Sequence, residues 1–174
     1  MKPNKDSLDH LAMLGAVLKW LPVVTQAVIG TPFTPQLVLA FIEQESGGNQ
    51  WAVRHEDHYK WLYRPRELAQ ASAISYDTEV SLQKHSFGLM QLMGAAARER
   101  GFTRRYLTEL CDPALNLKYS LRHLAWFARI WPTETDYIAA YNAGSPRKND
   151  DDEYVNQRYV DAVITKAKYW QVHA

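Results

Sequence analysis

Apolar residues recur every three or four positions along most of this chain, which is the spacing of helices that bury one face. The clearest case begins at Thr34 and Pro35, where a capping hydroxyl precedes a proline at the first helical position. Its apolar face is formed by Val38, Phe41 and Ile42. Glu45 continues that face, and Gly47 ends the helix. The pattern therefore predicts a carboxylate at the end of a buried helix face, where desolvation favours the neutral acid.

The same spacing predicts helices along most of the remaining chain. They cover residues 11–29 with a bend at Pro22, residues 95–100, residues 113–130, residues 135–142, and residues 155–170 with Val155 and Trp170 on the apolar face. Residues 51–63 and 72–82 show no clear period, and no stretch alternates convincingly with period two. No internal repeat, low-complexity tract or long linker divides the chain. We therefore expect an all-α, single-domain protein.

Length and composition exclude several classes of protein. The 174 residues suffice for one domain with a sizeable core. A formal net charge of +1 lacks the basic excess typical of nucleic-acid binders, so we expect no nucleic-acid partner. The single cysteine, Cys111, excludes an intrachain disulfide and is interpreted as a small buried residue near a helix start.

Two interpretations of the apolar stretch at residues 11–29 stay open. Lys19 interrupts the stretch, Pro22 lies within it, and no clear small-x-small cleavage site follows it. We expect residues 1–33 to be an N-terminal helical segment packed on a domain of residues 34–174, without stable insertion in a membrane. An export signal or membrane anchor is the alternative.

Glu45 and two downstream motifs are the candidates for chemistry. A carboxylic acid kept partly neutral by apolar surroundings can protonate a poor leaving group. The downstream motifs are Ser-Phe-Gly-Leu-Met-Gln at residues 86–91 and Ala-Ala-Tyr-Asn-Ala-Gly at residues 139–144. Each motif is weak by itself, but their order, with each on its expected structural element, is specific.

Together, Glu45-Ser46, the two motifs and the late pair Tyr159-Val160 resemble the SLT-type lytic transglycosylases over about residues 34–171. The resemblance implies a lysozyme-like fold with a catalytic cleft. It also implies cleavage of the β-1,4 bond between N-acetylmuramic acid and N-acetylglucosamine in peptidoglycan, without a cofactor. Glu45 would act first as acid and then as base, while the 6-hydroxyl of the substrate attacks to give a 1,6-anhydro product.

The resemblance further implies substrate-facing residues from both motifs and the late tyrosine, whose hydroxyl would reach Glu45. They are Ser86, Met90, Gln91, Tyr141, Asn142 and Tyr159. Asn116 matches a family position at the start of a core helix. A capping or turn role stays open for Gln91 and Asn142, and packing in the core stays open for Met90 and Tyr159.

The sequence departs from the family in the long separation between Glu45 and Gln91, which implies an insertion at about residues 51–85. This segment is rich in aromatic residues, and both a wall of the cleft and a structural elaboration stay open. Residues 87–91 also resemble goose-type lysozymes, which hydrolyse the same bond with the help of further acids. Hydrolysis is therefore the alternative activity, with acids between residues 56 and 79 as candidates: Glu56, Asp57, Asp77 and Glu79.

The expected partner is the peptidoglycan glycan strand, bound by a monomer. His55 and His58 do not form a recognised metal-ligand spacing, so we expect no metal site. We expect synthesis in the cytoplasm and action on the cell wall, as in phage endolysins released through a holin pore. A bacterial wall-remodelling or virion-borne enzyme stays open, and so does a function of another class, a non-catalytic peptidoglycan-binding module.

Overall fold

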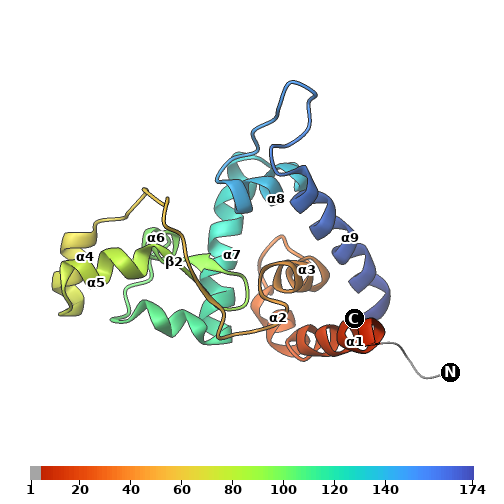
Figure 1. Ribbon diagram of the computed structural model, residues 1–174, viewed down its shortest axis with the longest axis horizontal. Coiled ribbons are helices and arrows are strands. Elements are labelled where there is room, and N and C mark those ends of the chain that lie inside the picture. Colours follow the sequence, from red (N-terminus) through yellow and green to blue (C-terminus); the bar gives the residue numbers. More distant parts are fainter. Residues whose placement is uncertain (1–4) are drawn as a thin grey trace. The chain divides into compact units, whose positions relative to one another are not determined.

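The helices predicted from the periodicity are present in the computed structural model, which describes residues 5–174 (Figure 1). The chain forms two compact units, unit 1 with residues up to Gly48 together with Leu121–Ala174, and unit 2 with Asn49–Ser120. Unit 1 contains α1 (Lys5–Leu18), α2 (Leu21–Ala27), α3 (Pro35–Ser46), α8 (Glu134–Ala143), α9 (Gln157–His173) and the second half of α7 (Pro113–Ile130). Unit 2 contains β1 (Val53–His55), α4 (Pro65–Ser72), α5 (Tyr76–Gln83), β2 (His85–Phe87), β3 (Leu92–Met93), α6 (Gly94–Glu99), the 3-10 helix η1 (Leu107–Cys111) and the first half of α7.

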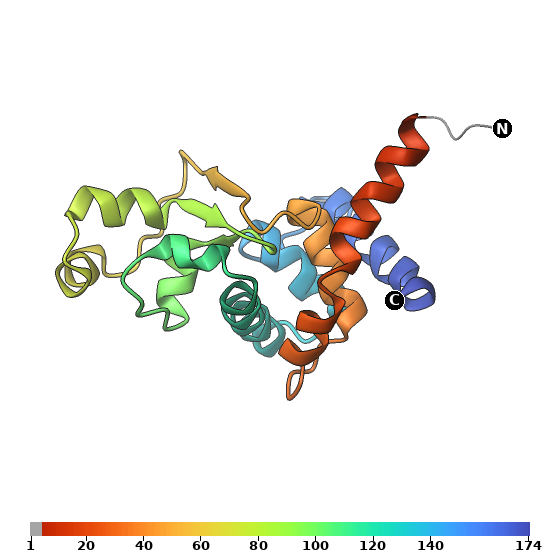
Figure 2. The same ribbon diagram turned by 90° about the horizontal axis from the view of Figure 1, so that it is seen from below.

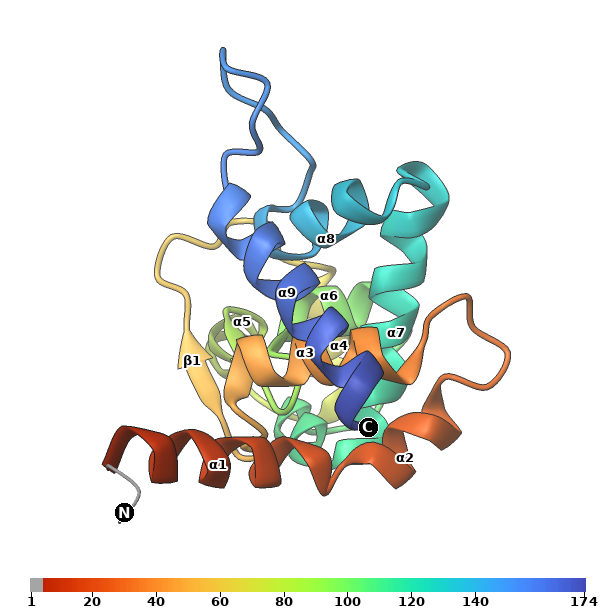
Figure 3. The ribbon, with the colours of Figure 1, turned by 90° about the vertical axis from the view of Figure 1, so that its right-hand side faces the viewer.

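Helix α3 is the centre of unit 1. The Thr34 hydroxyl accepts a hydrogen bond from the Leu37 amide at 3.2 Å, and Gly47 adopts a left-handed conformation with φ of 58° at the other end. Its apolar residues are fully buried: Val38, Phe41 and Ile42. Helix α9 crosses α3, and α1 and α2 also contact it (Figure 3). The start, end and buried face predicted for this helix are confirmed.

Residues 11–29 form two helices rather than one bent helix. The break lies at Lys19 and Trp20, and Pro22 occupies the first turn of α2, where its missing amide hydrogen costs nothing. Val17 and Val24 are fully buried, so both helices contribute to the core of unit 1. No helix within residues 5–174 has the length and apolar character needed to span a membrane.

The predicted start of the last helix was wrong. Val155 lies before α9 and is 54% exposed. Its amide donates to the Arg147 carbonyl at 2.9 Å, which places Val155 in the preceding loop. The apolar face of α9 is carried instead by Val160, Val163 and Trp170, all of which are buried.

Unit 2 contains a small antiparallel sheet that the periodicity did not predict. Within the described chain its order is β1-β2-β3, with Val53 opposite Phe87 and Ser86 opposite Met93. Strands of two or three residues are too short to show period-two alternation. Beyond the sheet, α4 and α5 lie side by side (Figure 2). The mostly helical class is therefore confirmed, with this sheet as an addition.

The core of unit 2 lies between the sheet, α6 and η1. Its largest buried members are Phe87, Leu92, Phe102, Leu107 and Leu110. Cys111 joins this cluster with 8% exposure, which confirms its interpretation as a small buried residue. Burial raises the pKa of its thiol above the ordinary value.

Candidate active site

Glu45 lies in the last turn of α3 and is half-buried. The hydroxyl of Tyr159, on α9, donates to Glu45 Oε1 at 2.5 Å. The two residues are 114 positions apart in sequence. This is the contact that the family resemblance implies, and it joins the carboxylate to an uncharged donor.

Tyr159 stays protonated over a wide range of pH. Burial of its side chain, followed by the charge of Glu45 and the hydrogen bond to it, raises the pKa of Tyr159 well above its ordinary value. A phenol that does not ionise continues to donate its hydrogen bond. Tyr159 can therefore orient Glu45 in either protonation state of the carboxyl group.

A second carboxylate on α3, that of Glu43, is fully engaged by other partners. Trp170 Nε1 donates to Glu43 Oε2 at 2.9 Å, and Lys166 Nζ lies 3.9 Å from Glu43 Oε1. Only 7% of the Glu43 side chain is exposed. Helix α9 therefore binds both glutamates of α3, and Glu43 receives a cation from it, Lys166.

Tyr141 and Asn142 lie at the end of α8, which Gly144 terminates with φ of 77°. The ring of Tyr141 packs against Phe41 of α3, with centroids 4.9 Å apart. Asn142 is exposed, and its Oδ1 accepts a hydrogen bond from Asn156 Nδ2 at 2.9 Å. Helices α3, α8 and α9 thus bring together the four site residues predicted in unit 1, namely Glu45, Tyr141, Asn142 and Tyr159.

Two further residues of this group could not be identified from the sequence. His123, on α7, lies with its ring 5.9 Å from that of Tyr141. Asn156 precedes α9 and binds both Asn142 and the Ala139 carbonyl. Neither carries a motif signal, because a histidine on an amphipathic helix and an asparagine before a helix are both common.

Ser86, Met90 and Gln91 are gathered in unit 2, in the hairpin between β2 and β3. The Ser86 hydroxyl donates to Gln91 Oε1 at 2.9 Å. Gln91 Nε2 donates to the carbonyls of Ala52 and Gly88, both at 3.0 Å. The Gln91 amide therefore ties the hairpin to the segment before β1, which is the turn role that the sequence left open.

Met90 and Asn116 support this hairpin from within the core. Met90 is fully buried, so its side chain lies beneath the turn. Asn116 Oδ1 accepts from the Met90 amide at 2.9 Å, and its Nδ2 donates to the carbonyls of Phe87 and Leu110 at 2.8 and 3.0 Å. A Cβ on Gly88, which has φ of 72°, would lie 2.5 Å from Asn116 Nδ2. This close approach explains the glycine of the motif.

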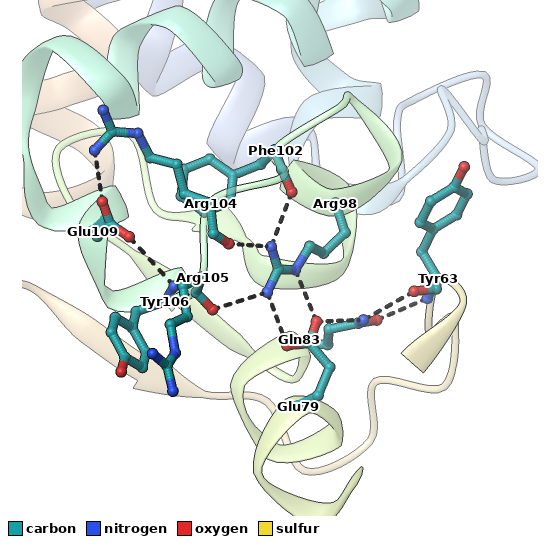
Figure 4. Close-up of polar contacts among 9 residues, drawn as sticks. All are labelled: Tyr63, Glu79, Gln83, Arg98, Phe102, Arg104, Arg105, Tyr106 and Glu109. Carbon is teal, nitrogen blue, oxygen red and sulfur yellow. Dashed lines mark hydrogen bonds and ion pairs between the residues drawn. The ribbon is translucent and has the colours of Figure 1, made fainter. Parts of the chain in front are cut away.

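Glu79, one of the acids considered for hydrolysis, serves a structural role. Its side chain and that of Arg98 are completely buried and form a two-point ion pair, with Arg98 Nε to Oε1 at 2.8 Å and Nη2 to Oε2 at 2.9 Å (Figure 4). Gln83 donates to Glu79 Oε1 at 2.9 Å and pairs with the backbone of Tyr63. A carboxylate engaged in this way cannot activate a water molecule at a substrate.

The other acids of that segment lie at the surface of unit 2. Glu56 accepts from Arg54 Nε at 2.5 Å, and Asp57 Oδ1 lies 3.1 Å from His55 Nδ1. Asp77 is exposed in the first turn of α5. Among the side chains that the structure describes, those of residues 11–174, His, Cys, Asp and Glu form no group of three that could hold a metal ion.

One comparison with known proteins identifies a family for this chain. The family model of the transglycosylase SLT domain matches residues 30–163. That span includes Glu45, both motifs and Tyr159. No curated protein matches the chain significantly.

Proposed function

The chain belongs to the transglycosylase SLT family, whose members are peptidoglycan-cleaving lytic transglycosylases, and from this premise we propose that Glu45 performs both proton transfers of the reaction. The observation that carries the proposal is the hydrogen bond from Tyr159 to Glu45 at 2.5 Å. It gives a half-buried carboxyl group a fixed orientation and a donor that does not ionise.

In the proposed reaction, Glu45 begins as the neutral acid. It donates its proton to the glycosidic oxygen while the bond from that oxygen to C1 of N-acetylmuramic acid breaks, and N-acetylglucosamine leaves with a free 4-hydroxyl. The resulting carboxylate then removes the proton of the muramic acid 6-hydroxyl as O6 bonds to C1. Glu45 is thereby reprotonated, the product is a 1,6-anhydro sugar, and no water is consumed. One carboxyl group serves both steps.

The remaining site residues take two kinds of role in this proposal. Tyr141 and Asn142, at the end of α8, contact the sugar chain. Ser86, Met90 and Gln91 stabilise the hairpin between β2 and β3 in unit 2. The outer surface of this hairpin contacts the substrate. The support for this division is that Met90 is fully buried and that the Gln91 amide makes three hydrogen bonds within its own unit.

Mass spectrometry of the fragments released from purified peptidoglycan tests the proposal. We expect anhydromuramic ends, which are lighter than reducing ends by the mass of one water. Reducing muramic acid ends would contradict the one-carboxylate mechanism and establish hydrolysis. Hydrolysis would then have to draw its base from a group other than Glu79, which is buried in an ion pair.

Replacement of Tyr159 by phenylalanine should lower turnover about 10- to 100-fold and move the alkaline limb of the pH–rate profile to higher pH. The phenol stabilises the carboxylate form of Glu45, so its loss makes that form less favourable and raises the pH at which the acid is consumed. The measurement is the rate of fragment release between mildly acidic and alkaline pH. A reduced rate with an unshifted limb would mean that Tyr159 only packs.

We also propose a setting in cell-wall lysis of the phage endolysin type, with synthesis in the cytoplasm and release through a separately encoded pore. The support is that residues 11–29 fold into α1 and α2 with Val17 and Val24 in the core of unit 1. Expression in the bacterial cytoplasm should cause lysis only when a pore-forming protein is co-expressed. Lysis without it would contradict this setting.

A further inference from the structure

Unit 2 contains a cavity of about 300 Å³ that the proposed reaction does not use. It lies between the segment before β1 and the region around η1. Its polar and aromatic lining consists of Gln50, Trp51, Arg104, Thr108, Glu109 and Asp112. This volume is at the small end of ligand sites and suits a single sugar residue.

Trp51 forms one wall and presents its indole to solvent, with 70% of the residue exposed. Its backbone is fixed on both sides. The Trp51 amide donates to Asn49 Oδ1 at 3.0 Å. The carbonyl of the following residue, Ala52, accepts from the Gly88 amide at 2.8 Å and from Gln91 Nε2 at 3.0 Å. A large aromatic face is therefore exposed on an ordered backbone, and covering it with a ligand would remove apolar surface from water.

Arg104 and Glu109 belong to the polar lining of the cavity. Arg104 Nη1 donates to Glu109 Oε2 at 2.6 Å, and Glu109 Oε1 accepts from the Tyr106 amide at 3.3 Å (Figure 4). The Arg104 carbonyl in turn accepts from Nη1 of the buried Arg98 at 2.7 Å. The Arg104 side chain remains 57% exposed and the Glu109 side chain 31% exposed. These contacts thus position a donor and an acceptor that both reach solvent.

We propose that this cavity binds an N-acetylated sugar residue of the glycan strand, as a second contact apart from the residues assigned to catalysis. A pyranose ring offers C–H groups to the Trp51 face and hydroxyl groups to Arg104, Glu109 and Thr108. The charged lining combines one cation with two carboxylates, Glu109 and Asp112, which disfavours an acidic peptide or a phosphate as occupant. The inference takes from the proposed function only that the substrate is a β-1,4-linked glycan.

Titration of the full-length Glu45→Gln protein with chitotetraose, followed through the tryptophan indole N–H signals by NMR, tests this site. We expect the Trp51 signal to shift in a saturable manner. Trp51→Ala should weaken binding at this cavity by about tenfold, measured through the backbone amides of residues 104–112, and Trp51→Tyr should restore most of it. The 70% exposure of Trp51 means that these substitutions leave the fold intact.

Trp61→Ala is the matched control, because Trp61 belongs to the same unit, is 76% exposed and does not line the cavity. It should bind chitotetraose as the parent does. Equal shifts at Trp51 and Trp61, no shift at Trp51, or tighter binding of a free stem peptide than of chitotetraose would each overturn the proposal. These binding outcomes do not depend on whether Glu45 is the catalytic acid. If Glu45 were not the catalytic acid, the Glu45→Gln protein would still cleave peptidoglycan.

Discussion

Replacing Glu45 with glutamine should reduce the release of soluble fragments from peptidoglycan by about a thousandfold or more. The amide preserves the size of the side chain and still accepts the hydrogen bond from Tyr159. It can neither donate a proton to the glycosidic oxygen nor remove one from the 6-hydroxyl. Because the same group is proposed for both steps, its loss affects each of them. The measurement is the initial rate of fragment release at fixed enzyme concentration.

Glu43→Gln provides the matched control for this experiment. Glu43 lies on the same helix two positions earlier, but its carboxylate is bound by Trp170 and Lys166. Its replacement should leave turnover within about threefold of the parent, since the amide retains the Trp170 contact. Both variants should show the same circular dichroism spectrum as the parent. An active Glu45→Gln together with an inactive Glu43→Gln would refute the assignment of the acid.

Arg98→Met should lower the free energy of unfolding by about 3–5 kcal/mol. The substitution leaves the carboxylate of Glu79 buried without a counter-charge, because both side chains are 0% exposed. It also removes the donor to the carbonyls of Phe102 and Arg104, which lie 3.0 and 2.7 Å from Arg98 Nη1. Equilibrium unfolding in urea measures the loss.

Two further variants separate the buried charge from the general loss of an arginine. The double variant Glu79→Leu/Arg98→Met removes both charges and should recover much of the stability lost in Arg98→Met. Arg104→Met breaks an ion pair that is 57% and 31% exposed, and should cost about 1 kcal/mol or less. If Arg98→Met were no less stable than Arg104→Met, the buried network would not be a stabilising element of unit 2.

Local signals in the sequence predicted much of the helical framework. The bounds of α3 follow from the hydroxyl of Thr34, the fixed φ of Pro35 and the left-handed conformation of Gly47, all of which act within a few residues. The spacing of Val38, Phe41 and Ile42 identified the face that is buried. The same reasoning failed at Val155, because a loop hydrogen bond to Arg147 overrides helical spacing there.

Apart from α4, α5, η1 and the start of α9, the amino-acid sequence by itself therefore determined which segments are helical, which faces are apolar and which residues are candidates for chemistry. The tertiary structure decided which of those residues meet: Tyr159 with Glu45, Arg98 with Glu79, and Gln91 with Ala52 rather than only with solvent. It also decided that Glu79 is structural and that Trp51 is exposed beside a cavity. The physical reason is that caps and periodicity depend on neighbours along the chain. Burial, ion pairing and hydrogen bonding between distant groups depend instead on how the helices and strands pack.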